Sequence, residues 1–457
     1  MISQNTRELL LEVRDRAAAA GIRASLVLHR EKSHLMRIGN NSVSLNTSET
    51  LTRLDVRVLD GRREGTHTSL GHIAGRAFVD EALSIAVEKA RVAVPKDYEP
   101  ILECVEESVD EAPQDDAGLA DIDPAVKAGV YAEIIETLGK GYNFSGSWSS
   151  GRTEIYLVST AGPNEACHSG TDQAFTVVLK HPGAKWELQN EQSGWMAGSV
   201  TAATATAALG SLLPLYERQP GARNEPGDYT LLLGPAAIAE LMLYALYTGA
   251  QGRMYEEEMG WTTGMKIGDQ VFSERISVVD DPGSDLTFRF GFDMSGMRRR
   301  PFPVIDRGRL AGLMYDLGTA AKYGRAQTGH SLESTSISIA TGDGPADPMR
   351  AVAGMGRVLV IPALHYMNLP NMSKGIVTGS SRFCATTAVD GVVTAPIFST
   401  RLTDSFRNIF GNVAAISPYA VSVNLSSTYG RRAPVAMSVP SYMVVEKVRM
   451  TDCADSF

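Results

Sequence analysis

The sequence is poor in the features that mark secreted, membrane-spanning and DNA-binding proteins. Its four cysteines lie far apart and form no CxxC pair, so neither a disulfide framework nor a cysteine-rich zinc site is indicated. The formal net charge of −9 argues against a surface that holds duplex DNA. The first twenty residues are too charged for a signal peptide, and no apolar run approaches a membrane span. We therefore expect a cytoplasmic protein that binds neither nucleic acid nor membrane.

The chain is long enough for more than one domain. Its 457 residues exceed the length of a typical single domain, and an apolar fraction of 44% is ordinary for a globular protein. Residues 217–228 (ERQPGARNEPGD) combine proline, glycine and charge, a composition typical of a linker. The sequence therefore predicts an N-terminal domain over residues 1–216 and a C-terminal domain over residues 229–457.

Hydrophobic periodicity predicts an α+β fold. In the N-terminal part, apolar residues recur with helical spacing at residues 6–20 and 71–92, and strand-like stretches lie at residues 24–31, 34–45 and 50–59. Asn40-Asn41 and Asp60-Gly61 are typical hairpin turns. This order indicates helices that cover one face of an antiparallel sheet. The second half is rich in short strand patterns separated by turns, which indicates a β-rich domain.

Residues 228–255 contain the most informative local pattern. A short apolar strand leads through Gly234 and Pro235 into a helix predicted at residues 236–247. Pro235 suits the first turn of a helix, because a missing N–H costs nothing there. Gly249 suits the end of the helix, where a left-handed residue is common. The sequence therefore predicts a buried strand, a tight turn and a buried helix in succession.

This segment resembles the strand-turn-helix of the TldD/PmbA family, once called modulators of DNA gyrase. Four further stretches resemble family elements in the same order, at residues 54–65, 303–315, 389–397 and 407–412. Together they extend the resemblance over nearly the whole chain. The resemblance implies an N-terminal sandwich of helices and antiparallel sheet, followed by a β-rich C-terminal domain of the TldD/PmbA type.

In the TldD branch of the family, this helix carries a HExxxH zinc-peptidase motif. Two histidines there bind the metal, and the adjacent glutamate acts on the metal-bound water. Aligned without gaps, the motif positions fall on Leu243, Tyr244 and Thr248, and the C-terminal cysteine of the metal site falls on Tyr429. None of these residues can replace the one it displaces. The resemblance thus implies no metal and no catalytic residue in this chain, with zinc held by a partner subunit.

Tyrosine and arginine residues near these positions are candidates for lining a substrate groove. Tyr244 and Tyr247 offer flat apolar faces with a polar tip, although tyrosines at such spacing also pack in protein cores. Beside Tyr429, Arg431 and Arg432 could hold the carboxylate end of a peptide-like ligand. His29 and His34 are five residues apart, but on a strand this separation turns the side chains to opposite faces, so no metal pair is expected.

The resemblance therefore implies a PmbA/TldE-like subunit that pairs with a TldD-like HExxxH metallopeptidase in a heterodimer. Such a subunit would shape the groove for an unfolded peptide or a small peptide-like substrate, including natural-product precursors. Two alternatives remain open from the sequence. The chain could be a homo-oligomeric binding or scaffold protein with no catalytic role, or a self-sufficient hydrolase of altered chemistry.

Overall fold

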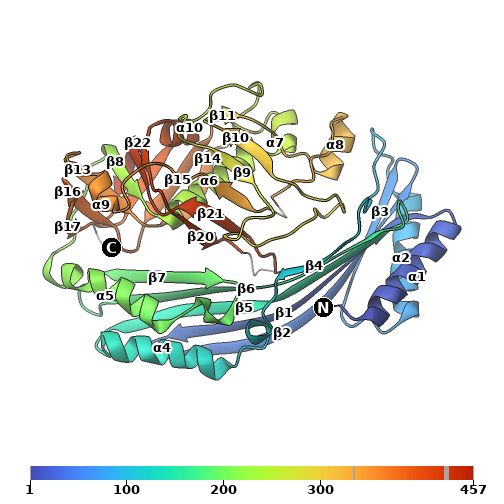
Figure 1. Ribbon diagram of the computed structural model, residues 1–457, viewed down its shortest axis with the longest axis horizontal. Helices are drawn as coiled ribbons and strands as arrows, with labels where there is room; N and C mark the ends of the chain where they lie inside the picture. Colours follow the sequence, from blue (N-terminus) through green and yellow to red (C-terminus); the bar gives the residue numbers. More distant parts are fainter. Residues whose placement is uncertain (1, 333–334, 427–431, 456–457) are drawn as a thin grey trace.

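The structure of the chain is a computed structural model that describes residues 2–332, 335–426 and 432–455. A curved, mostly antiparallel sheet forms the N-terminal half, and two further sheets form the C-terminal half (Figure 1). The C-terminal half lies above one face of the first sheet, and helices cover the opposite face (Figure 1). The predicted class, a helix-and-sheet N-terminal part followed by a β-rich C-terminal part, is confirmed.

The first sheet has the strand order β3-β2-β1-β5-β6-β4, with β7 paired to β6. Its strands are β1 (Arg23–Gly39), β2 (Ser42–Asp60), β3 (Arg63–Leu70), β4 (Val109–Gln114), β5 (Asn143–Ser159), β6 (Glu165–Lys180) and β7 (Glu187–Gly194). The helices of this half are α1 (Gln4–Ala19), α2 (Arg76–Val92), α3 (Ala117–Ala120), α4 (Pro124–Leu138) and α5 (Ala202–Arg218), with a 3₁₀ turn η1 (Ala197–Ser199).

Two long strands replace the three short ones that the sequence predicted. β1 continues through the polar residues 31–33 and joins the predicted strand 24–31 to the first part of the predicted strand 34–45. β2 contains the last residues of that predicted strand and all of the predicted strand 50–59. The break predicted at residues 32–33 is wrong, because the strand continues there and Glu31 and Ser33 face a buried polar site in which both form hydrogen bonds. The hairpin at Asn40-Asn41 is confirmed, with φ of 50° and 62° at the two residues.

The two faces of the first sheet have different partners. Even-numbered residues of β1, such as Leu26 and Met36, belong to the two apolar clusters that α1, α2, α4 and α5 form with the sheet. Odd-numbered residues, such as His29 and Glu31, face the C-terminal half, where Glu31 accepts a hydrogen bond from the amide of Arg432. Because side chains alternate along a strand, β1 supplies a helix-covered core and a polar surface at once.

The C-terminal half contains a six-stranded and a nine-stranded sheet. The six-stranded sheet has the order β11-β10-β9-β12-β21-β20, and the nine-stranded sheet has the order β14-β15-β18-β22-β8-β13-β16-β17, with β19 paired to β22. The six strands are β9 (Val278–Asp280), β10 (Phe302–Asp306), β11 (Arg309–Leu310), β12 (Ile337–Ile339), β20 (Ala420–Asn424) and β21 (Ala436–Pro440).

The strands of the larger sheet are β8 (Gly227–Leu233), β13 (Arg357–Ile361), β14 (Leu364–Asn371), β15 (Ile376–Ser381), β16 (Thr386–Val389), β17 (Val392–Pro396), β18 (Thr400–Ser405), β19 (Val413–Ile416) and β22 (Met443–Cys453). The helices of this half are α6 (Pro235–Gly249), α7 (Gly252–Glu256), α8 (Leu317–Tyr323), α9 (Pro348–Ala351) and α10 (Phe406–Gly411). Apolar residues of α6 share one large core with strands of both sheets.

The strand-turn-helix predicted around Gly234 and Pro235 is confirmed as β8 and α6. The role predicted for Gly249 is wrong, since it is a helical residue and the cap residue Ala250 is right-handed. A Cβ on Gly249 would lie 2.3 Å from the indole of Trp261, so the glycine serves close packing. The indole Nε1 of Trp261 also donates to the carbonyl of Ala245 at 2.9 Å.

One helix in the described residues meets the length and composition of a membrane span, which corrects the expectation that no run approaches one. Residues 197–218 comprise η1 and α5, and other proteins satisfy the same test with helices outside membranes. In the structure Ala205, Leu209 and Tyr216 of α5 are buried in the apolar cluster beneath the first sheet. The division at residues 217–228 stays a prediction; within it, Ala222 pairs with Ile397 of the C-terminal half.

Candidate functional site

The positions that the sequence assigned to a lost zinc motif lie on α6. Thr248 is fully buried, and its hydroxyl donates to the carbonyl of Tyr244 at 2.9 Å. Leu243 and Tyr244 are half-buried and pack against the large C-terminal core. Burial raises the pKa of the Tyr244 hydroxyl, and the nearby charge of Glu240 raises it further.

These residues do not fit a zinc ion. Leu243 has no donor atom, and the only polar side-chain atom of Thr248 is already bonded to its own helix. Zinc in proteins takes imidazole, thiolate or carboxylate ligands, usually four in a tetrahedral arrangement. Within residues 2–332, 335–426 and 432–455, no group of three His, Cys, Asp or Glu side chains is arranged to hold a metal ion.

The candidate groove residues occupy different places. Tyr247 is 46% exposed and lines a hollow of about 520 Å³ near the C-terminal end of α6. The same hollow is lined by acidic residues, among them Glu103, Asp293 and Asp316. Tyr429 and Arg431 lie outside the described residues, so their predicted role stays a prediction.

Arg432 reaches the first sheet. Its Nε lies 2.6 Å from Asp172 Oδ1 and its Nη2 lies 2.7 Å from Oδ2, while its backbone N–H donates to Glu31 Oε2 at 2.7 Å. Gly151 makes room for it, because a Cβ there would lie 3.2 Å from the guanidinium. The guanidinium is therefore already engaged within the chain, and the predicted contact with a ligand carboxylate remains untested.

A second hollow, of about 460 Å³, opens at the other end of α6. Pro235 and Ala236 of the first helical turn line it, together with residues of β6, β7 and β20. On β7, Glu191 lines this hollow and accepts a hydrogen bond from the side chain of Gln189. The 460 Å³ hollow and the contacts of Arg432 thus lie between the first sheet and the C-terminal half. The 520 Å³ hollow lies between the C-terminal half and Glu103, which belongs to the segment that connects α2 to β4.

Two carboxylates near this second hollow lack a cationic partner among the described residues. Glu191 is an exposed residue, and partial desolvation by the surrounding protein raises its pKa. Burial also raises the pKa of Glu240 on α6, and the charge of Glu191 raises it further. The arrangement places negative charge beside the start of α6, where it would attract a cationic group of a bound molecule.

Neither glutamate was among the residues predicted from the sequence. Glu240 could have been found, because it is the one charged residue in an otherwise apolar helix of 15 residues. A lone charge in such a helix indicates a position that faces a cavity or a partner. Glu191 gave no such signal, since β7 alternates polar residues on both faces.

The C-terminal half matches a known family. Residues 226–452 match the family described as PmbA/TldA metallopeptidase C-terminal domain. Together with the three-sheet fold, this match defines a protein of α+β class with a C-terminal domain of the metallopeptidase type. The chain belongs to the TldD/PmbA family.

Solved structures share the fold over the whole chain. TldE from Thermococcus kodakarensis has a TM-score of 0.83 at 16% identity, and covers 97% of this chain and 100% of its own. A putative modulator of DNA gyrase from Bacteroides thetaiotaomicron has a TM-score of 0.82 at 17% identity, and covers 99% of this chain and 100% of its own. An uncharacterized protein of Methanocaldococcus jannaschii is 26% identical over 102 residues, which span 22% of this chain and 24% of that relative.

Proposed function

We propose that this chain is the subunit without metal in a heterodimeric metallopeptidase of the TldD/TldE kind. The observation that carries the proposal is the set of residues at the zinc-motif positions of α6. Its motif positions hold Leu243, Tyr244 and Thr248, and Thr248 is buried with its hydroxyl bonded to its own helix. A peptidase of this kind needs metal ligands and a general base at these positions, so the metal would belong to a partner chain.

The space between the two halves supports a role in binding. Two hollows, of about 460 and 520 Å³, lie near the two ends of α6, and each is large enough for several side chains of a peptide. The substrate in this proposal is an unfolded peptide or a small peptide-like molecule. Glu191 and Glu240 favour a positively charged group at the 460 Å³ hollow, and Tyr247 offers an aromatic face at the 520 Å³ hollow.

Assembly with a HExxxH homologue from the same genome tests the proposal. The two chains are co-expressed with a tag on one, purified, and sized by light scattering. The proposal predicts a stable complex of one copy of each chain, with peptide hydrolysis that neither chain shows alone. A self-associated complex of this chain that excludes the homologue would favour the scaffold alternative. Peptide hydrolysis by this chain alone would favour a self-sufficient hydrolase.

A substitution in the groove tests whether the chain contributes to substrate binding. Tyr247→Ala removes an exposed aromatic face from the larger hollow, and we expect it to raise the KM of the complex several-fold while assembly is retained. Tyr419→Ala is the matched control, because Tyr419 is also exposed and lines none of the cavities described. Equal KM values for both variants would remove Tyr247 from the substrate path.

A further inference from the structure

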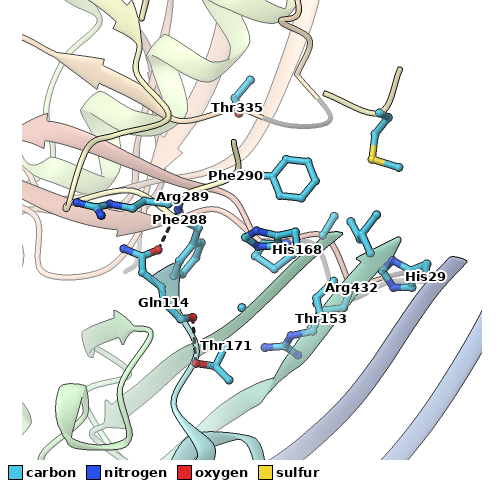
Figure 2. Close-up of a pocket in the computed structure, with 15 residues that line it drawn as sticks. His29, Gln114, Thr153, His168, Thr171, Phe288, Arg289, Phe290, Thr335 and Arg432 are labelled. Atoms are coloured by element: carbon cyan, nitrogen blue, oxygen red, sulfur yellow. Dashed lines mark hydrogen bonds between the residues drawn. The ribbon is translucent and has the colours of Figure 1, made fainter. Parts of the chain in front are cut away.

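A third, smaller cavity of about 60 Å³ lies between the first sheet and the C-terminal half (Figure 2). Its floor includes Gly170 of β6, which is paired with Thr153 of β5 and with Gln114 of β4. Because a glycine has no side chain, a gap is left between its two neighbours on this face of the sheet. Phe288 and Phe290 of the C-terminal half line the cavity from the other side (Figure 2). A single water molecule needs about 10–15 Å³ of such space, so the cavity has room for roughly four or five atoms of that size.

Five buried polar atoms that have no hydrogen-bond partner in the described part of the chain belong to residues that line this cavity. They are Nδ1 of His29, Oγ1 of Thr153, Nδ1 of His168, Nε of Arg289 and Oγ1 of Thr335. Thr153 and Thr335 are each only 3% exposed, and His29 is 2% exposed. Leaving such atoms unpaired is costly, so native proteins seldom do so without an occupant. The cavity therefore has the properties of a site for a small polar ligand.

The charged groups that line the cavity are cationic. Arg289 and Arg432 line it, and among the described residues no carboxylate does so. The guanidinium of Arg432 is engaged with both oxygens of Asp172. Arg289 contacts Asp285 through Nη2, but the side chain of that aspartate is 87% exposed, so water screens the pair, and Nε of Arg289 stays unpaired. Because a guanidinium can only donate hydrogen bonds, the occupant of the cavity must accept them.

Each of the two histidines has one ring nitrogen turned to a glutamate behind it. Nε2 of His29 lies 3.0 Å from Glu31 Oε2, and Nδ1 of His168 lies 3.4 Å from Glu111 Oε1. Burial would raise the pKa of both glutamates, but the groups that contact them outweigh this effect and the pKa values are lowered, so both are ionised. The other ring nitrogen of His168 borders the cavity, since a Cβ on Gly170 would lie 3.1 Å from Nε2. A histidine held between a carboxylate and a second anion takes the doubly protonated form, in which both nitrogens donate.

We propose that this cavity binds the carboxylate group of a small organic acid of about the size of acetate. A carboxylate accepts hydrogen bonds through two oxygens and donates none, as the donors of the lining require. Placed above Gly170, it has the hydroxyl of Thr153 on the paired strand and Nε2 of His168 on the same strand. The rest of the cavity is lined by the unpaired groups of His29, Arg289 and Thr335. This site does not depend on the proposed peptidase partnership.

Calorimetric titration of the purified full-length chain with sodium acetate, at constant ionic strength, tests the proposal. We expect saturable binding of one acetate per chain. Acetamide has nearly the same shape without the charge, and we expect no saturable binding of it. Absence of acetate binding would overturn the proposal, with ordered water as the occupant. Tighter binding of inorganic phosphate than of acetate would also overturn it, because the site would then be built for a phosphate group.

A threonine variant tests whether acetate binds in this cavity. Thr153→Val removes the unpartnered hydroxyl with little change in shape, and we expect it to weaken acetate binding about tenfold, the usual effect of losing a hydrogen bond to a charged group. Because this hydroxyl has no partner within the described chain, the thermal midpoint without acetate should not fall. Thr387→Val is the matched control, because Thr387 on β16 also has a buried, unpartnered hydroxyl and lines none of the cavities described.

An arginine variant tests the role of the charge. Arg289→Gln removes the guanidinium and keeps the backbone N–H of this residue, which donates to Gln114 Oε1. We expect it to weaken acetate binding several-fold. Arg350→Gln is the matched control for the change in net charge, since the side chain of Arg350 is 82% exposed and lines none of the cavities described. Wild-type affinity for acetate in both Thr153→Val and Arg289→Gln, with unchanged thermal midpoints, would overturn the assignment to this cavity.

Discussion

The guanidinium of Arg432 and the carboxylate of Asp172 form a two-point ion pair between the C-terminal half and the first sheet. Nε lies 2.6 Å from Oδ1 and Nη2 lies 2.7 Å from Oδ2, and each side chain is 1% exposed. A buried ion pair of this geometry fixes orientation more than it adds stability, because both charges lose their water. The contact therefore sets how the two halves face each other.

Breaking this pair from one side should be costly. Arg432→Ala leaves Asp172 buried without its partner, and we expect a loss of about 3–5 kcal/mol in the free energy of unfolding. Urea unfolding measures the change. Arg449→Ala is the control, since the pair of Arg449 with Asp228 is well exposed and should contribute about 1 kcal/mol or less. A loss below that of the control would show that the halves are held together by other contacts.

Lys127 on α4 should make stability depend on pH. Its ammonium group is buried beneath the sheet, where Nζ donates to Ser150 Oγ at 2.8 Å. Burial lowers its pKa to about 7, and the charge of Arg432 adds to the effect. In the unfolded chain the pKa of Lys127 keeps its ordinary value of 10.5. Below pH 7 the lysine is charged in both states, so the folded chain bears the full cost of burying the charge. This cost decreases as the pH rises from 7 and disappears at about pH 10.5.

Lys127→Met should therefore change the pH profile of unfolding. The buried charge costs roughly 4 kcal/mol at pH 7, from which the lost hydrogen bonds of Nζ subtract. We expect the variant to gain stability relative to the wild type at pH 6–7, and this gain to shrink between pH 8 and 10. Chemical denaturation at several pH values measures it. A difference that does not vary with pH would contradict the lowered pKa.

Glu240 should show the opposite linkage at lower pH. Because its pKa is raised in the folded chain, the wild type binds an extra proton between the unfolded value near 4.5 and the folded value, and stability falls as the pH rises through that window. Glu240→Gln should be more stable than the wild type at pH 7 and equal to it near pH 4. Glu88→Gln, at an exposed position on α2, serves as the control and should change little at either pH. Thermal unfolding at the two pH values measures both variants.

Two glycines in helices should respond in opposite ways to the same substitution. Gly249→Ala puts a Cβ into the indole of Trp261, and we expect a loss of about 1–3 kcal/mol. Gly210→Ala in α5 meets only ordinary contact with Leu138 at 3.8 Å, and should gain up to about 1 kcal/mol from helix propensity. Stabilisation of both variants would show that Trp261 can move aside without cost.

Local patterns predicted much of the fold. Periodicity in the first twenty residues predicted α1, and the pair Asn40-Asn41 predicted the hairpin between β1 and β2. The pairing of distant elements could not be predicted this way, since it depends on contacts such as Arg432 with Asp172 that lie 260 residues apart. The cavity beside His29 is hidden for the same reason, because its polar lining comes from four strands of the first sheet and from the C-terminal half.

The candidate site was predicted only in part. The resemblance to the TldD/PmbA family located the helix that carries the zinc motif in the TldD branch, and the structure confirms this helix as α6. Adjacent positions on a helix always face different directions, but the spacing alone does not say which of them faces the core. It therefore could not predict that Thr248 is buried while Tyr247 lines a hollow. The paired glutamates on α6 and β7 come together only through folding, so no local pattern contains them.

The location of zinc and of catalysis in a co-purified pair tests the central claim most directly. The complex of this chain with a HExxxH homologue is assayed for zinc content and peptide hydrolysis, alongside each chain alone and a pair whose homologue has its motif glutamate replaced by glutamine. We predict about one zinc per pair, held by the homologue, with hydrolysis that requires both chains and is lost in the glutamine variant. Stoichiometric zinc in this chain alone, or hydrolysis that persists in the glutamine variant, would contradict the account.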